Sequence, residues 1–254
     1  MRRKHLLALG ALFAVVALAG CLGGTSEIDA DRLNENATYD WNTSANATYN
    51  ISRSSYATVL TVSNESVEVW QRDAIEGETP VRLRALKFRF DNGTVVRSNQ
   101  TSNLTARTGN DRTTIEMPTD SGQVAYTAAR SGKSFSTPVF VNGSQEIILP
   151  PGARVGLPLL SQVGPGNWNS SVENDRMTVR WGNLTDGTLN TRYYLERDLL
   201  IFAAVAIIAI LVGGGGGLYY LRQIRSLEAK REDLDIDIDY DDDEFDDGPP
   251  PGMR

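Results

Sequence analysis

The apolar run from Leu199 to Leu221 constrains this chain more than any other feature. Its 23 residues include no charged side chain, and a helix of that length crosses a hydrocarbon core of about 30 Å with some tilt. Basic residues follow the run closely, at Arg222, Arg225, Lys230 and Arg231. Because basic residues gather on the cytoplasmic side of spanning helices, we expect a transmembrane helix over 198–221 and a cytoplasmic C-terminus.

A second and shorter apolar run lies at the N-terminus. The basic residues MRRKH precede about thirteen apolar or small residues from Leu6 to Leu18, which is the layout of a secretory signal. The sequence LAGC that ends at Cys21 resembles the lipobox of secreted lipoproteins, which implies cleavage before Cys21 and a lipid on its thiol. Arg2-Arg3 resembles a twin-arginine export signal. The alternative is an uncleaved first segment, which gives the same topology.

These two runs predict how the chain is organised. We expect a signal peptide over 1–20, a lipid-anchored linker over 21–37, an extracellular domain over 38–197, a transmembrane helix over 198–221, and a cytoplasmic helix with an acidic tail over 222–254. One lipid chain holds a protein only marginally, whereas a spanning helix is effectively irreversible. A lipid on Cys21 would therefore tie the other end of the external domain to the same cell membrane.

Five consecutive glycines, Gly213 to Gly217, interrupt the apolar run. Each costs about 1 kcal/mol relative to alanine inside a helix, but a backbone in lipid must still satisfy its own hydrogen bonds. Gly213 and Gly217 have the small-xxx-small spacing that lets two helices approach closely, which predicts a homodimer through this helix. A flexible joint near the inner leaflet is the alternative.

The segment between the two apolar runs is rich in acceptor patterns for N-glycosylation, Asn-x-Ser/Thr. Asparagine, serine and threonine also favour turns, which accounts for part of the excess. We expect glycans on some of the eleven candidates, which are Asn36, Asn42, Asn46, Asn50, Asn64, Asn92, Asn99, Asn103, Asn142, Asn169 and Asn183.

The same segment reads as a series of short strands. Apolar and polar residues alternate in several of them, and no sustained helical period occurs outside the membrane run. The pattern predicts a mainly β fold: an antiparallel β-sandwich of immunoglobulin-like size, followed by one C-terminal transmembrane helix and an acidic disordered tail. The expected strands are 47–51, 56–62, 66–70, 81–90, 94–97, 113–117, 123–129, 138–141, 144–149, 177–181 and 189–195.

Three local patterns refine this expectation. Asn92-Gly93 and Asn142-Gly143 stand between apolar segments and predict two hairpin turns with exposed tips. Within 81–90 the alternation changes phase, which predicts a β-bulge near Ala85 or Leu86. The other face of this strand then carries Arg82, Arg84, Lys87 and Arg89 in one stripe. We interpret the stripe as a solvated face, with binding of an anionic polysaccharide or a lipid headgroup as the alternative.

Two further segments have an unusual composition. The apolar stretch from Leu157 to Leu160 lies between Pro-Gly motifs. We expect it to pack on the end of the sandwich, with contact to a partner as the alternative. The tail from Arg222 holds twelve acidic and five basic residues, which favours a solvated, disordered chain. Its acidic part, 233–247, lacks the glycine and glutamate spacing of a calcium-binding EF-hand.

The chemistry needed for most catalysis is missing outside the signal segment. The only histidine is His5 and the only cysteine is Cys21, so the mature chain offers no imidazole base, thiol nucleophile or His/Cys metal site. No glycine-rich phosphate loop follows a strand, and the roughly balanced charge of the external segment gives no case for nucleic acid. We therefore expect no enzyme activity, cofactor, metal or nucleic-acid partner.

Several stretches along the chain are distinctive: MRRKHLLALG with LAGC, FSTPVFVNGSQEIILPPG, RYYLERDLLIF, the glycine run, LYYLRQIRSLE and PPPGMR. Together they resemble a family of haloarchaeal membrane-anchored, lipoprotein-like proteins that is known only as a domain of unknown function. The resemblance implies a membrane location and a halophilic source, and it supplies no activity. Only four of the basic residues are lysines, which also resembles the composition of halophile proteins.

These features favour a non-enzymatic cell-surface protein that is anchored in the membrane and binds an envelope component or another membrane protein. One alternative is a surface enzyme that acts on glycans with two carboxylates about 5–10 Å apart. The other is a solute-binding lipoprotein, for which the second membrane anchor is unusual.

Overall fold

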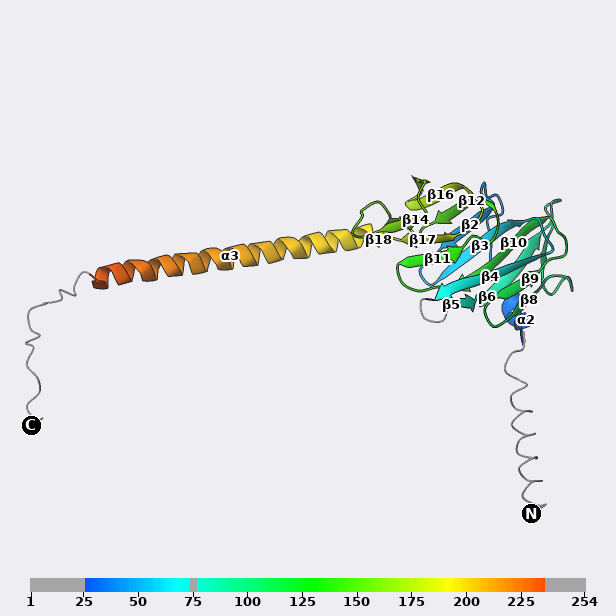
Figure 1. The fold of residues 1–254 in the computed structure, drawn as a ribbon, viewed down its shortest axis with the longest axis horizontal. Coiled ribbons are helices and arrows are strands. Elements are labelled where there is room, and N and C mark those ends of the chain that lie inside the picture. The colour runs from blue at the N-terminus through cyan, green and yellow to red at the C-terminus, as the bar shows by residue number, and fades with distance from the viewer. Residues whose placement is uncertain (1–25, 74–76, 236–254) are drawn as a thin grey trace, which may run out of the picture. The chain divides into compact units, whose positions relative to one another are not determined.

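A computed structural model describes residues 26–73 and 77–235. The chain divides into two units, residues 1–198 and residues 199–254. Among the described residues, the regular elements of the first unit are strands apart from one short helix, and those of the second unit, 199–235, belong to one long helix (Figure 1). The expected signal peptide, Cys21 and the acidic tail beyond residue 235 lie outside the described residues.

The larger layer of the β domain is an eight-stranded sheet. Its pairings are antiparallel except for β2 with β12, which run parallel. In spatial order its strands are β15 (Trp168–Glu173), β16 (Arg176–Leu184), β12 (Gly143–Ile148), β2 (Ala47–Ile51), β3 (Ser55–Val62), β10 (Gly122–Ala129), β6 (Leu83–Arg89) and β7 (Val95–Arg97).

Smaller sheets form the opposing layer. The five-stranded sheet has the order β1 (Ser26–Glu27), β8 (Thr105–Thr108), β9 (Thr113–Glu116), β4 (Ser66–Asp73) and β5 (Gly77–Pro80). A three-stranded sheet contains β11 (Ser134–Pro138), β17 (Thr188–Arg192) and β14 (Gln162–Gly164). A two-stranded pair joins β13 (Ala153–Arg154) to β18 (Tyr194–Leu195).

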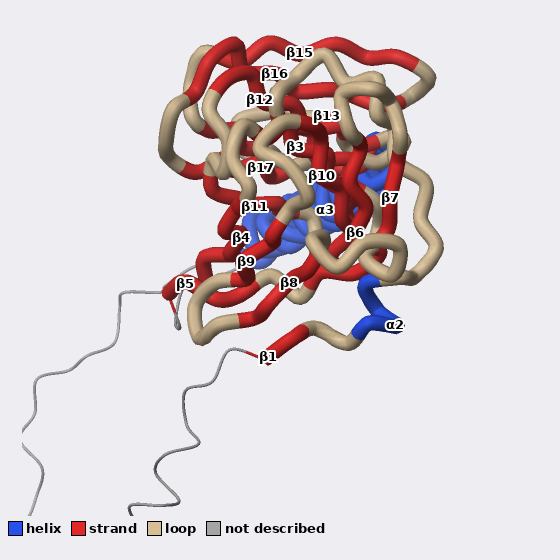
Figure 2. Tube along the Cα trace, turned by 90° about the vertical axis from the view of Figure 1, so that its right-hand side faces the viewer, coloured by secondary structure: helices blue, strands red, loops and turns tan. Residues whose placement is uncertain are grey.

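The hydrophobic core lies between these layers, with β8, β9 and β4 on one side of the large sheet (Figure 2). Side chains of the large sheet such as Phe88 and Ile147 belong to the same buried cluster as Ile115 of β9 and Leu189 of β17. The predicted face of β3 is confirmed, because Tyr56, Thr58, Leu60 and Val62 are all buried. The mainly β, antiparallel sandwich predicted from the sequence is therefore present.

The predicted β-bulge is present at Ala85. Its φ of 54° is positive, and the register between β10 and β6 shifts between Ala125 and Thr127. The extra residue returns Leu86 and Phe88 to the face that Leu83 occupies, and all three are fully buried.

The face of β6 that was interpreted as solvated is covered by an N-terminal segment, residues 34–46, which we call the covering segment. Tyr39 of this segment packs on Ala85 and on the neighbouring strands β3 and β10 in a second small core. The Lys87 ammonium donates to the Ala37 carbonyl, and the Arg89 guanidinium donates to the Trp41 carbonyl at 3.2 Å. The interpretation as a solvated face is therefore wrong for Lys87 and Arg89, which hold backbone that crosses the sheet. Arg84 pairs with Glu35 at 3.2 Å, and Arg82, just before β6, is exposed as expected.

Residues before the covering segment also fold onto the domain. β1 pairs with β8, and the short helix α2 (Ala30–Leu33) buries Leu33 in the main core. Both elements lie within the range 21–37, in which we expected a linker.

The two predicted hairpins have different outcomes. The turn at Asn92-Gly93 joins β6 to β7 as predicted, with Phe90 N donating to Thr94 O at 2.9 Å. The Asn142-Gly143 prediction is wrong, because β11 pairs with β17 while β12 pairs with β16 and β2. Residues 139–142 instead carry the chain from one layer of the sandwich to the other.

The apolar stretch Leu157–Leu160 does not pack on the sandwich as expected. Leu159 is 90% exposed, and Leu157 and Leu160 are each 40% exposed. The stretch forms a compact turn between β13 and β14, in which Leu160 N and Ser161 N both donate to the Leu157 carbonyl.

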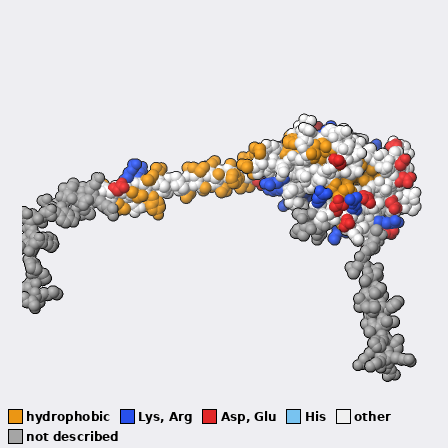
Figure 3. All heavy atoms as spheres, in the orientation of Figure 1, with side chains coloured by type: hydrophobic (Ala, Val, Ile, Leu, Met, Phe, Trp, Pro, Cys, Tyr) orange, Lys and Arg blue, Asp and Glu red, His pale blue; other side chains and the backbone are white. Residues whose placement is uncertain are grey.

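The predicted C-terminal helix is present as α3 (Glu196–Asp235). The part Glu196–Lys230 is long and apolar enough to cross a membrane. Hydrophobic side chains cover much of its surface (Figure 3). The five glycines remain helical, as expected for backbone that must satisfy its own hydrogen bonds.

Candidate binding groove

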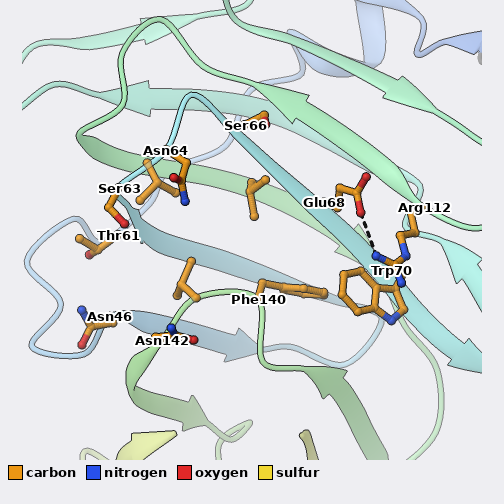
Figure 4. Close-up of a pocket in the computed structure, with 13 residues that line it drawn as sticks. Asn46, Thr61, Ser63, Asn64, Ser66, Glu68, Trp70, Arg112, Phe140 and Asn142 are labelled. Carbon is orange, nitrogen blue, oxygen red and sulfur yellow. Dashed lines mark hydrogen bonds and ion pairs between the residues drawn. The ribbon is translucent and has the colours of Figure 1, made fainter. Parts of the chain in front are cut away.

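A groove of about 430 Å³ lies where β4 faces the crossing segment 139–142 (Figure 4). We call it the Trp70 groove. Strand alternation in β4 buries Val67 and Val69 in the core and turns Glu68 and Trp70 to the other face. The volume lies in the range of about 300–1,000 Å³ that is usual for small-ligand sites. Its lining residues are Asn46, Thr61, Val62, Ser63, Asn64, Ser66, Val67, Glu68, Trp70, Arg112, Phe140, Val141 and Asn142.

Two aromatic rings form one end of the groove. Trp70 and Phe140 meet edge to face, with centroids 5.2 Å apart and planes inclined by 69°. Phe140 reaches this position because the chain changes layers after β11. Aromatic side chains bring a large apolar surface with little conformational freedom, so this end of the groove is both apolar and rigid.

Arg112 supplies the positive charge of the groove. Its guanidinium lies over the Trp70 ring at 4.1 Å from the centroid and pairs with Glu68 and Glu78, each at 2.8 Å. Hydrogen bonds to Glu68 and then Glu78 raise the pKa of Arg112, so the group stays protonated. A guanidinium with two carboxylate partners and one aromatic partner has a fixed orientation.

Three predicted glycosylation candidates, Asn46, Asn64 and Asn142, lie together along the rim of the groove. The Asn46 amide oxygen accepts hydrogen bonds from the backbone N and the hydroxyl of Ser144, both at 3.0 Å. A Cβ on Gly143 would lie 2.4 Å from that oxygen. Asn46 thus fixes the start of β12 against the covering segment and needs glycine at position 143.

The other candidates are spread over the domain. Asn50 is half-buried, and its amide oxygen accepts a hydrogen bond from Arg176 at 2.6 Å. The remaining ones, Asn36, Asn42, Asn92, Asn99, Asn103, Asn169 and Asn183, are exposed, as are the three on the groove rim.

Gly213 and Gly217 lie one helical turn apart on α3. A Cβ added at either position would meet open space. Cys21, the predicted lipid attachment point, lies outside the described residues. Within residues 26–73 and 77–235, no group of three or more His, Cys, Asp or Glu side chains is arranged to hold a metal ion.

The Trp70 groove is not predicted by the sequence. Trp70 lies on the same face of β4 as the polar residues Ser66 and Glu68. An aromatic residue on an otherwise polar strand face was therefore the one sequence feature that indicated a binding surface there. Phe140 and Arg112 carried no such signal, because only the crossing of the layers and the register of β9 bring them to Trp70.

A β-sandwich followed by one helix of membrane-spanning character defines the general class of this chain. Within that class, the chain belongs to a family of unknown function (DUF5803), whose family model matches residues 43–239. The match runs from the covering segment through the β domain and α3. No curated protein matches the chain.

Proposed function

We propose that this protein is a membrane-anchored, non-enzymatic binding module whose Trp70 groove takes an uncharged saccharide of the cell envelope. The single observation that carries the proposal is the convergence of an aromatic pair, one oriented guanidinium and several amide and hydroxyl groups in one groove. Anchoring by α3 would keep the groove close to envelope polymers.

The anchor rests on the composition and flanks of α3. Glu196–Lys230 is of spanning length, and Arg222, Arg225 and Lys230 follow its apolar part. The positive-inside tendency then puts the C-terminus in the cytoplasm and the β domain at the outer surface of the cell membrane. A homodimer through Gly213 and Gly217 stays a prediction of the sequence.

The chemistry of the lining favours a hydroxyl-rich, uncharged ligand. Glu68 and Arg112 are the two charged residues of the lining and have opposite signs, so the lining residues carry no net charge. The amides of Asn64 and Asn142 and the hydroxyls of Ser63 and Ser66 both donate and accept. Sugar hydroxyls match such groups, and the apolar faces of sugar rings match aromatic side chains.

The arrangement of the carboxylates gives no support to glycoside hydrolysis. That reaction needs two carboxyl groups facing the scissile bond from opposite sides. Glu68 and Glu78 instead bind the same guanidinium, that of Arg112, at 2.8 Å each. The guanidinium occupies the position between them that a substrate would need.

Saccharide binding tests the proposal. The full chain, reconstituted in nanodiscs, would be passed over immobilised neutral envelope polysaccharide in about 1 M KCl. High salt is chosen because the sequence resembles halophile proteins. At about 1 M salt, charge interactions beyond about 3 Å are screened. We expect saturable binding that weakens about tenfold in Arg112→Lys, which keeps the charge but loses the planar fork.

Arg107→Lys is the matched control, since Arg107 is an exposed arginine that also pairs with glutamates, Glu27 and Glu116, but does not line the groove. Equal binding by the wild type and both variants, or no binding at all, would contradict the proposal.

The same proposal includes a lipid on Cys21 and glycans on exposed sequence acceptors. Mass spectrometry of the mature protein with its modifications intact tests both. A diacylglycerol-type adduct on an N-terminal Cys21 and hexose adducts on exposed asparagines are expected. A retained Met1 would remove the lipid from the account, and unmodified asparagines would remove the glycans.

A further inference from the structure

Four consecutive exposed residues, Leu157-Pro158-Leu159-Leu160, form a turn that we call the leucine turn. Single exposed leucines are common on soluble domains, but contiguous apolar patches mark contact surfaces. Leu159 is 90% exposed, so the β domain contributes little to covering its side chain.

The leucine turn is held in a defined shape. Leu160 N donates to Leu157 O at 3.0 Å and Ser161 N donates to the same oxygen at 2.8 Å. The Ser161 hydroxyl accepts from Gly156 N at 2.8 Å and donates to Leu157 O at 2.9 Å. These bonds pair the Leu157 carbonyl and the N–H groups of Gly156, Leu160 and Ser161 within the turn. Each pairing lowers the cost of moving the turn into an apolar medium.

Strand pairing fixes the leucine turn at the end of the domain from which the chain continues into α3. On one side of the turn, Arg154 of β13 pairs with Tyr194 of β18. On the other side, Gln162 of β14 pairs with Arg192 of β17. Both partners lie within four residues of Glu196, the first residue of α3. The start of the apolar run at Leu199 follows three residues later.

A groove with a basic lining lies at the same end of the domain. It has a volume of about 950 Å³, and Tyr193, Leu195 and Glu196 contribute to it. We call it the Arg176 groove. Its four basic side chains are Arg53, Lys133, Arg176 and Arg197.

Acidic groups compensate this lining only in part. Glu196 is the one acidic residue of the lining and pairs with Arg154 at 3.0 Å. Asp198 pairs with Lys133 and, at 3.6 Å, with Arg197. Arg176 donates to the carbonyls of Leu149 and Ile51. The Arg176 groove therefore keeps a net positive charge, and basic side chains are visible at this end of the domain (Figure 3).

We propose that this end of the domain docks on the outer surface of the bilayer that α3 enters. The leucine turn inserts into the interfacial region, and the Arg176 groove takes the phosphate of an anionic lipid headgroup. Apolar side chains beside basic ones are the composition of interfacial membrane contacts. The inference rests on the proposed membrane insertion of α3, because covalent continuity with Leu199 keeps this end of the domain beside the membrane.

A site-specific fluorophore tests the docking. Cys21 is the only cysteine, so the full chain with Cys21→Ser accepts a single label at a new position. Leu159→Cys would carry an environment-sensitive nitrobenzoxadiazole probe in vesicles of phosphatidylcholine and phosphatidylglycerol that contain doxyl-labelled phosphatidylcholine. Val95→Cys is the control, because Val95 is also an exposed apolar residue. It lies on β7 opposite Arg89, which pairs with Gln123 at the start of β10. The other end of β10 leads to Arg130, which donates to the hydroxyl of Tyr193 in the lining of the Arg176 groove.

We expect a blue-shifted emission and at least twofold quenching by doxyl lipid at position 159, and neither effect at position 95. The chain could float with the vesicles and resist carbonate extraction while the probe at 159 is neither shifted nor quenched. That result would overturn the docking and leave the membrane anchor intact. Chain that does not float would overturn both.

The headgroup is tested by replacing the quencher with doxyl-labelled phosphatidylglycerol at equal mole fraction. In the wild type, quenching at position 159 by doxyl-phosphatidylglycerol should be about three times that by doxyl-phosphatidylcholine. In Arg53→Gln, the two lipids should quench equally. Arg107→Gln, which removes an exposed arginine outside the Arg176 groove, should keep the difference. Equal quenching by both lipids in the wild type would overturn the headgroup assignment.

Discussion

The Arg112 guanidinium lies 4.1 Å from the centroid of the Trp70 ring. Trp70 belongs to β4, and Arg112 directly precedes the antiparallel neighbour of β4, the strand β9. Val69 of β4 pairs with Thr113 of β9, so the next position along each strand brings Trp70 opposite Arg112. Glu68, two residues earlier on the same face, completes the contact as an ion pair. The orientation of the indole is thus set by sheet register, which makes the Trp70 groove a rigid feature of the fold.

Replacing Tyr39 by phenylalanine tests how the covering segment is held. The Tyr39 hydroxyl lies 2.7 Å from the Ala85 carbonyl, to which it donates, and 2.9 Å from the Thr127 hydroxyl. Because the substitution leaves a buried carbonyl without its partner, it should lower the free energy of unfolding by about 1–3 kcal/mol. Urea unfolding in detergent measures this. Tyr194→Phe, at a half-buried tyrosine, should change the value much less; equal losses would contradict the role of the Ala85 bond.

The same tyrosine gives a pH dependence. Burial raises the pKa of Tyr39 from 10.0 to about 12, against a smaller opposing effect of the Thr127 hydrogen bond. Its contribution to stability is complete below pH 10. Between pH 10 and 12 the unfolded chain releases the Tyr39 proton while the folded chain keeps it, so the Tyr39 contribution to stability should fall by about 1.4 kcal/mol per pH unit. The unfolding free energy of Tyr39→Phe should fall less steeply across this range than that of the wild type, and parallel slopes would refute the assignment.

Gly143→Ala tests the contact that joins β12 to the covering segment. The new methyl group would lie 2.4 Å from the Asn46 amide oxygen, on a backbone with φ +117°. Gly156 has a similar φ of +123° but open space around the position of its Cβ. Gly143→Ala should therefore destabilise the chain by about 1–3 kcal/mol more than Gly156→Ala. Equal midpoints in urea would show that only backbone strain matters.

Self-association in vesicles tests the predicted homodimer. Gly213→Leu with Gly217→Leu places bulk on one helix face, and Gly215→Leu places it about 200° around the helix. If helices meet through the first face, the double variant should weaken dimerisation by about tenfold, measured by energy transfer between labelled chains, and Gly215→Leu should not. Unchanged transfer in the double variant would favour a flexible joint.

The sandwich was predictable where one strand face is buried and the other is not. β17 shows this, because Leu189 and Thr191 are buried while Asn190 and Arg192 on the other face are exposed. The bulge at Ala85 was predictable for the same reason, since a phase change in an apolar pattern must be absorbed by the backbone.

Short polar strands and long-range crossings were not predictable. β15 has almost no buried side chain, so its sequence carries no apolar pattern. Asn142-Gly143 has the local chemistry of a hairpin turn, but the flanking strands find better partners in different sheets. The covering segment was missed because the basic stripe of β6 looks the same whether water or backbone carbonyls face it.

The environment of the leucine turn was also not predictable from sequence. An apolar stretch predicts that its side chains are buried, but the same stretch can be buried by protein or by another apolar medium. Pairing of β13 and β14 with the strands that lead into α3 gives the position of the turn, and only that position points to the membrane.

Hydrogen–deuterium exchange of the full chain in nanodiscs, with and without neutral envelope polysaccharide, tests the binding function most directly. Amides of β4 and of residues 139–142 should become protected when the polysaccharide is added, while those of the β6–β7 hairpin should exchange at an unchanged rate. Protection that is absent from β4, or that falls elsewhere on the domain, would contradict the assignment of the Trp70 groove as the binding site.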